Sequence, residues 1–143
     1  MNRYQILIEY EGTLYNGWQI QKKGKSIQEN IEIVLSKLLK EKIKIHGSGR
    51  TDAGVHAKEQ SAHFDTTNKI IQKDKLLNSL NFFLNKKKIS ILKIKKKNKL
   101  FHSRYSAKER RYMYLIRNDA SPSVINFNRE WHIKKKIDVE LMK

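Results

Sequence analysis

The feature that most constrains the fold is an amphipathic helix with a marked beginning, expected over residues 27–40. Ser26 and Glu29 form a capping box, in which the hydroxyl and the carboxylate satisfy reciprocal backbone N–H groups. Apolar residues then follow at helical spacing, namely Ile27, Ile31, Val34, Leu35 and Leu38. A helix with one apolar face has to bury that face against another layer of structure.

The segments around this helix have the pattern of strands. The sequence predicts strands over residues 3–10, 42–46, 58–65, 86–99 and 109–117, and a further strand at Trp131 and Ile133. Asp74 is expected to cap a second helix with the buried stripe Leu76, Leu77, Leu80, Phe83 and Leu84, and Asp138 to cap a third. This order predicts an α+β fold, a mainly antiparallel sheet with helices on one face, in a single domain spanning residues 1–143.

The charge of the chain points to a polyanionic partner. The formal net charge is +17, with 31 Lys and Arg against 14 Asp and Glu. Such a chain repels itself unless nucleic acid or an anionic membrane surface neutralises it, although an A/T-rich genome would also enrich lysine. No stretch is long and apolar enough to span a membrane. The absence of cysteine fits a reducing compartment, so we expect a cytoplasmic protein.

Residues 47–56 (GSGRTDAGVH) are the densest candidate for chemistry. Three glycines let the backbone turn tightly and approach a ligand. A dinucleotide-binding loop is rejected, because Asp52 stands where a glycine is needed and would repel the pyrophosphate. Asp52 is available for nucleophilic or acid–base work, and the guanidinium of Arg50 would favour its ionised form. The alternative is an Asx-turn, in which Asp52 only bonds its own backbone.

Several further candidate residues suit ordinary structural roles. Four of the five histidines, His46, His56, His63 and His102, have no metal-binding spacing, and we expect no metal. Beside Phe64, His63 is expected to be a packing residue. Trp18 is either a core anchor or a surface on which RNA bases stack. The strand at 86–99 has eight lysines and no acid, which suits contact with phosphates.

Three motifs together resemble the TruA family of tRNA pseudouridine synthases. IEYEGTLYNGWQIQ at 8–21 is similar to the opening motif of the family. GRTDAGVHA at 49–57, followed by Gln60 and His63, is similar to its signature loop. FHSRYSAKERRYMY at 101–114 resembles its second motif. The resemblance extends from about residue 4 to residue 140. It implies that the chain folds as the N-terminal half of a pseudouridine synthase catalytic domain.

The resemblance implies a function and a set of residues. Asp52 matches the catalytic nucleophile, Arg50 the arginine that helps displace the target base, and Tyr112 the tyrosine that stacks on the uracil. Arg50, Tyr112, His56 and Arg111 are the implied substrate-binding residues. The implied reaction is the isomerisation of uridine to pseudouridine at positions 38–40 of the tRNA anticodon arm. It uses no cofactor and no metal, and the family works as a homodimer.

Two departures from the family pattern modify these expectations. Residues 81–85 lack the proline that usually precedes the following strand. Family members also continue for roughly another hundred residues, as the resemblance implies, with a third motif whose arginine pairs with the catalytic aspartate. We therefore expect residues 1–143 alone to bind tRNA weakly and to show little or no turnover. The alternatives to an enzyme are a non-catalytic RNA-binding remnant and a basic ribosome-associated protein.

Overall fold

The structure, a computed structural model, describes residues 1–142. Two compact units divide the chain, the first being Met1–Lys108 and the second starting at Glu109. The single domain expected over residues 1–143 therefore stays a prediction.

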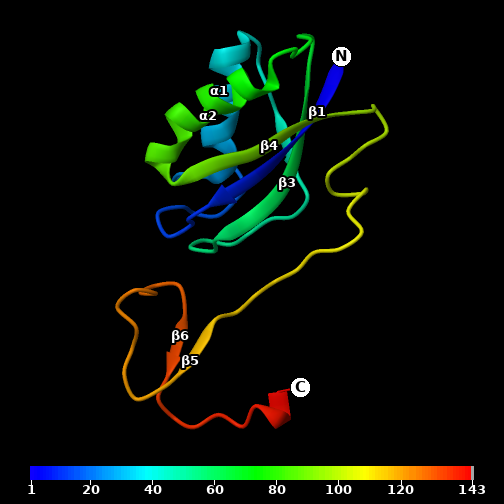
Figure 1. Ribbon diagram of the computed structural model, residues 1–143. Coiled ribbons are helices and arrows are strands. Elements are labelled where there is room, and N and C mark those ends of the chain that lie inside the picture. Colours follow the sequence, from blue (N-terminus) through cyan, green and yellow to red (C-terminus); the bar gives the residue numbers. More distant parts are fainter. Residues whose placement is uncertain (143) are drawn as a thin grey trace. The chain divides into compact units, whose positions relative to one another are not determined.

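The first unit is a four-stranded antiparallel sheet with two helices on one face (Figure 1). The strands are β1 (Asn2–Tyr10), β2 (Ile45–Gly47), β3 (Ala57–Thr66) and β4 (Ile89–Lys97), in the order β2-β3-β1-β4. The helices are α1 (Ile27–Leu39) and α2 (Lys73–Leu84), and a 3₁₀ turn (Asn85–Lys87) follows α2. The predicted α+β fold, with a mainly antiparallel sheet and helices on one face, is confirmed.

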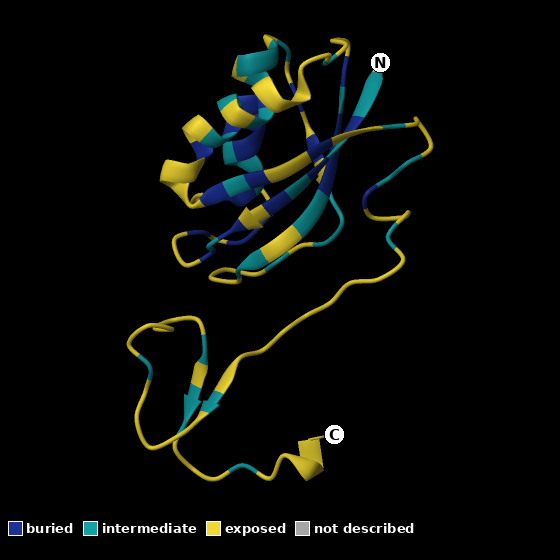
Figure 2. Cartoon of the chain, in the orientation of Figure 1, coloured by how far each residue is buried: buried dark blue, intermediate teal, exposed yellow. Residues whose placement is uncertain are grey.

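The core lies between the sheet and the helices (Figure 2). Alternate residues of β1 point into it, and their neighbours on β3 and β4 do the same, because side chains directly opposite in a sheet share a face. Buried residues of this layer include Tyr4, Ile6, Ile8, Phe64, Ile91 and Ile94 from the strands and Ile27, Ile31, Leu35, Leu80 and Leu84 from the helices. The opposite face of the sheet, called here the open face, carries Arg3, Gln5, His63, Asp65, Lys93, Lys95 and Lys97.

The sequence placed most of these elements to within two or three residues. The capping box of α1 forms as expected, with the Glu29 backbone N–H donating to the Ser26 hydroxyl at 3.2 Å. Strand β2 begins three residues later than predicted. The backbone N–H groups of Ile43, before β2, and of Ile45, its first residue, donate to side chains of α1 and not to a strand. Helix α2 begins at Lys73 with Gln72 as its N-cap residue, so Asp74 lies in its first turn and does not cap it.

The second unit has little regular structure. It holds β5 (Ile116–Asn118) and β6 (Trp131–Ile133), paired in parallel, and a 3₁₀ turn (Glu140–Met142). The Asp138 carboxylate accepts hydrogen bonds from the Glu140 and Leu141 backbone N–H groups, so it caps this 3₁₀ turn, and no α-helix follows it among residues 139–142. The strand predicted over 109–117 is wrong for residues 109–115. Those residues have no strand partner within this unit, and an extended segment is a strand only when a neighbour receives its hydrogen bonds.

The two units differ clearly in how far their residues are buried. None of residues 109–142 is buried, whereas the first unit has a continuous core (Figure 2). A pair of three-residue strands is too small to be stable without further packing. Among residues 1–142, no helix has the length and apolar character needed to cross a membrane.

Candidate active site

Asp52 lies on an exposed turn of the loop that joins β2 to β3. The turn closes through a hydrogen bond from the Val55 backbone N–H to the Asp52 carbonyl oxygen at 3.2 Å. The side chain of Asp52 is exposed and makes no hydrogen bond or ion pair within residues 1–108. The Asx-turn alternative does not occur, because the Gly54 backbone N–H donates to the Tyr15 carbonyl oxygen instead. The carboxylate is thus available to a ligand.

The residue before Asp52 is held firmly by the opening motif. The Trp18 backbone N–H donates to the Thr51 carbonyl oxygen at 3.0 Å, and the hydroxyls of Tyr10 and Thr51 are hydrogen-bonded at 2.8 Å. Burial raises the pKa of Tyr10, so its hydroxyl keeps its proton at neutral pH. Trp18 is only 3% exposed and its ring lies 6.0 Å from that of Tyr10, which confirms the core-anchor interpretation.

Gly12 and Gly17 allow the loop to lie directly on this motif. A Cβ atom on Gly17, whose φ is +97°, would lie 2.5 Å from the Thr51 carbonyl oxygen. A Cβ atom on Gly12 would lie 2.0 Å from the Val55 carbonyl oxygen. Two segments almost forty residues apart in sequence are therefore packed backbone against backbone. Sequence reasoning named both motifs but missed this contact, and the glycines of the opening motif were the available signal.

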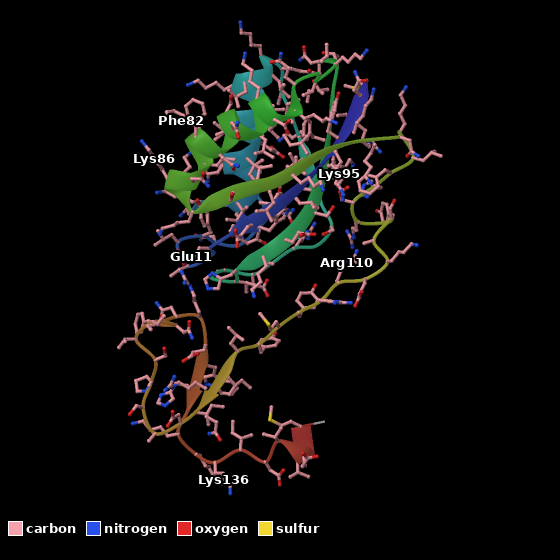
Figure 3. The ribbon with its side chains drawn as sticks, in the orientation of Figure 1. Glu11, Phe82, Lys86, Lys95, Arg110 and Lys136 are labelled. Atoms are coloured by element: carbon pink, nitrogen blue, oxygen red, sulfur yellow. The ribbon has the colours of Figure 1, made fainter. Side chains whose placement is uncertain are left out.

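His56 supports the same loop from its far end. Its Nδ1 accepts a hydrogen bond from the Gly12 backbone N–H at 3.0 Å and lies 4.0 Å from the carboxylate of Glu11, which follows β1 (Figure 3). This contact gives His56 a supporting position in the fold. Its implied role in substrate binding stays a prediction.

The other expected site residues are distributed over both units. Arg50 is exposed on the same loop as Asp52, two residues before it. Arg111 and Tyr112 belong to the second unit, where Arg111 pairs with Glu109 at 2.7 Å in an exposed ion pair. Tyr112 lies outside any strand and is 71% exposed. That Tyr112 and Arg111 meet Asp52 at one site stays a prediction.

Three of the histidines gather on the open face of the first unit. The rings of His46 and His63 stack at 5.1 Å, and His102 lies 4.6 Å from His63. The Nδ1 atom of His63 accepts a hydrogen bond from the Ser103 backbone N–H at 3.1 Å. His63 is 1% exposed, so the expected packing role is confirmed. Within residues 1–142, no three His, Cys, Asp or Glu side chains are placed to hold a metal ion.

The burial of His63 predicts a loss of stability in mild acid. Burial, followed by the nearby charges of Arg3, His102 and His46, lowers the pKa of His63 to about 4, while Asp65 opposes the shift. The unfolded chain takes up this proton near pH 6.5, so the free energy of unfolding falls from pH 6.5 to pH 4, by up to roughly 3 kcal/mol. Chemical denaturation over this pH range measures the slope.

His63→Asn is the matched variant for this slope, because its Oδ1 replaces Nδ1 as an acceptor that does not titrate. We expect the pH 4–6.5 slope to be much shallower in His63→Asn. Arg3 holds the pKa of Asp65 below its usual range through a hydrogen bond, so the contribution of Asp65 is lost only at lower pH. An unchanged slope in the variant would contradict the assignment to His63.

Comparison with known proteins gives consistent matches along the chain. Residues 6–106 match a family model described as tRNA pseudouridine synthase. A Pelagibacter ubique protein named tRNA pseudouridine synthase A is 60% identical over 143 residues, which are 100% of this chain and 58% of that protein. Proteins of the same name from Neorickettsia sennetsu and Anaplasma phagocytophilum are 43% and 42% identical, over 99% of this chain and 58% of each relative. The chain thus spans a little over half the length of these curated relatives.

Proposed function

The chain belongs to the tRNA pseudouridine synthase family, and we propose that the protein carrying it isomerises uridine to pseudouridine in tRNA, with Asp52 as nucleophile. The observation that most supports this proposal is that the Asp52 carboxylate is accessible on a fixed backbone. The carboxylate is exposed and unbonded within the first unit, while the backbone on both sides is fixed by Thr51 and Gly54. A nucleophile on a preorganised loop loses little freedom when it meets its target.

The proposed reaction needs no group beyond side chains and substrate. The Asp52 carboxylate attacks the substrate, either at the ribose or at the uracil ring, and the bond between the base nitrogen and the ribose breaks. The uracil turns, a new bond forms from the ribose carbon to C5 of the ring, and the bond to Asp52 breaks, which restores the free carboxylate. The ring nitrogen released from the ribose takes up one proton and C5 loses one, so no proton is gained or lost overall. Product and substrate are isomers, so no oxidant or reductant takes part.

The proposed roles of the other residues follow from the cost of exposing the base. Extruding a uridine from its stack costs a few kcal/mol. Arg50, exposed near Asp52, is proposed to fill the vacated space, and Tyr112 is proposed to stack on the extruded uracil. His56 and Arg111 are proposed to contact the RNA backbone. We also propose positions 38–40 of the anticodon arm as the target and a homodimer as the working form.

The direct test is formation of pseudouridine in tRNA by the purified protein that carries this chain, because little or no turnover is expected of residues 1–143 alone. The expected result is release of tritium from C5-labelled uridine in unmodified tRNA, with the new pseudouridines mapped to positions 38–40. Pseudouridines at other positions of the tRNA would support the proposed reaction but contradict the proposed target. Tight tRNA binding without any release would favour the non-catalytic RNA-binding alternative.

A further inference from the structure

Four rings contact one another in succession on the open face of the first unit, starting at His46 in β2, which directly precedes the Asp52 loop, and the rings of His46 and His102 are also only 6.0 Å apart. They are His46, His63, His102 and Tyr105, called here the ring row. Neighbouring ring centroids lie 5.1 Å apart for His46–His63, 4.6 Å for His63–His102 and 4.4 Å for His102–Tyr105. His63 is buried, whereas Tyr105 at the end of the row is 78% exposed. One face of the Tyr105 ring is therefore backed by His102 while most of its surface is open to solvent.

The segment that carries Tyr105 is held in place by backbone hydrogen bonds to side chains. His102 Nδ1 accepts from the Arg104 and Tyr105 backbone N–H groups at 3.2 and 3.4 Å. Arg3 donates to the Lys99 and Phe101 carbonyl oxygens at 2.8 and 2.7 Å. The position of Tyr105 is thus fixed by its neighbours and not by contacts of its own ring with the core. A surface fixed before binding loses little conformational entropy when a ligand arrives.

The surroundings of the ring row favour an anionic ligand over an apolar protein surface. Lys93, Lys95 and Lys97 lie on the same face of β4, and Lys95 is labelled in Figure 3. The Lys97 ammonium lies 4.8 Å from the centroid of the Phe101 ring, which in turn lies 6.0 Å from that of His63. Rings and cations therefore adjoin. An aromatic surface bordered by lysines is typical of single-stranded nucleic acid binding, in which bases stack and phosphates are neutralised.

We propose that the ring row is a second RNA contact, at which an unpaired nucleobase stacks on Tyr105 and the flanking phosphates lie along the lysines of β4. The inference rests on the proposed function only in taking RNA as the partner. It assigns to Tyr105 a binding role that is separate from the chemistry at Asp52.

The test compares Tyr105→Leu with the unaltered protein in binding to two RNAs, a hairpin with an unpaired loop and a fully paired duplex of equal length. Stacking of a base is worth about 1–3 kcal/mol, so we expect hairpin affinity to fall roughly 5- to 150-fold in Tyr105→Leu. Duplex affinity should change less than about twofold. The slope of log affinity against log salt should stay the same, because no phosphate contact is lost.

Two further variants separate base stacking from hydrogen bonding by the Tyr105 hydroxyl and from phosphate contact. Tyr105→Phe keeps the ring and should bind the hairpin within about twofold of the unaltered protein. Lys95→Gln should weaken hairpin and duplex alike and reduce the salt slope by about one. Equal hairpin affinity in Tyr105→Leu, or an equal loss in Tyr105→Phe, would overturn the proposal. These experiments measure RNA binding and not turnover. A negative result for Tyr105 would therefore not bear on pseudouridine formation, and a protein without turnover could still be tested for RNA binding at Tyr105.

Discussion

Replacing Asp52 with Asn should abolish pseudouridine formation while leaving the fold and the tRNA affinity in place. The substitution keeps the shape of the side chain but removes the nucleophilic carboxylate, and loss of a nucleophile costs at least about a thousandfold in turnover. Asp52 is exposed and unbonded within the first unit, so the free energy of unfolding should change by less than about 0.5 kcal/mol. Tritium release, filter binding and thermal melting measure the three quantities.

Asp74→Asn is the matched control for this experiment. Asp74 is also an exposed acid of the first unit, in the first turn of α2. The two variants change the net charge by the same amount, so any general effect of charge on RNA binding appears in both. We expect Asp74→Asn to retain normal turnover. Normal turnover in Asp52→Asn would remove Asp52 as the nucleophile, and equal losses in both variants would indicate an effect of charge alone.

The elements of the first unit could be predicted because their signals are local. The capping box at Ser26 and the apolar spacing after it determine where α1 begins and which face it buries. Alternation along residues 3–10 and 58–65 determines which side of β1 and β3 meets the helices. Strand β2 was placed less well, since the N–H groups of Ile43 and Ile45, just before β2 and at its first residue, donate to side chains of α1. Sequence patterns carry no information on such contacts.

The sequence predicted which residues belong to the candidate site, but not the contacts that hold the Asp52 loop in place. Motif resemblance identified Asp52 and Arg50, and the structure places both exposed on one loop. The hydrogen bond between the hydroxyls of Tyr10 and Thr51 depends on how β1 contacts a loop about forty residues further along the chain. Alternation along the strand predicts only that Tyr10 faces inward. The ring row was missed for the same reason, because it arises from the pairing of His46 with His63 and the return of the chain at His102.

The strand predicted at 109–115 shows the opposite limit of sequence reasoning. Alternating Tyr112 and Tyr114 have the pattern of a strand, yet both are exposed and neither is in a strand. Strand propensity reflects how well a residue fits a pleated, half-buried surface, so it has an effect only where a neighbouring strand provides that surface. Among residues 109–142, only residues 116–118 and 131–133 have such a neighbour.

Replacing Gly12 with Ala should have the largest effect of any single methyl group added near the candidate site. The new Cβ would lie 2.0 Å from the Val55 carbonyl oxygen and 2.6 Å from its carbonyl carbon. Because both are backbone atoms, either the loop or the end of β1 must move, and the Gly12 hydrogen bond to His56 is strained with it. We expect a loss of roughly 2–3 kcal/mol in the free energy of unfolding. Displacing the loop by about 1 Å should cost about a hundredfold in turnover.

Gly49→Ala provides the control, since Gly49 lies in the same loop as Asp52 and nothing is within 4 Å of its added Cβ. This variant should melt within about 0.5 kcal/mol of the unaltered protein and keep its turnover. The comparison therefore isolates the contact between the loop and the opening motif from the general effect of adding a methyl group. If Gly12→Ala melted normally and turned over normally, the loop would not depend on that contact. If Gly49→Ala were equally damaging, glycine freedom in the loop, rather than close packing at Gly12, would govern the position of Asp52.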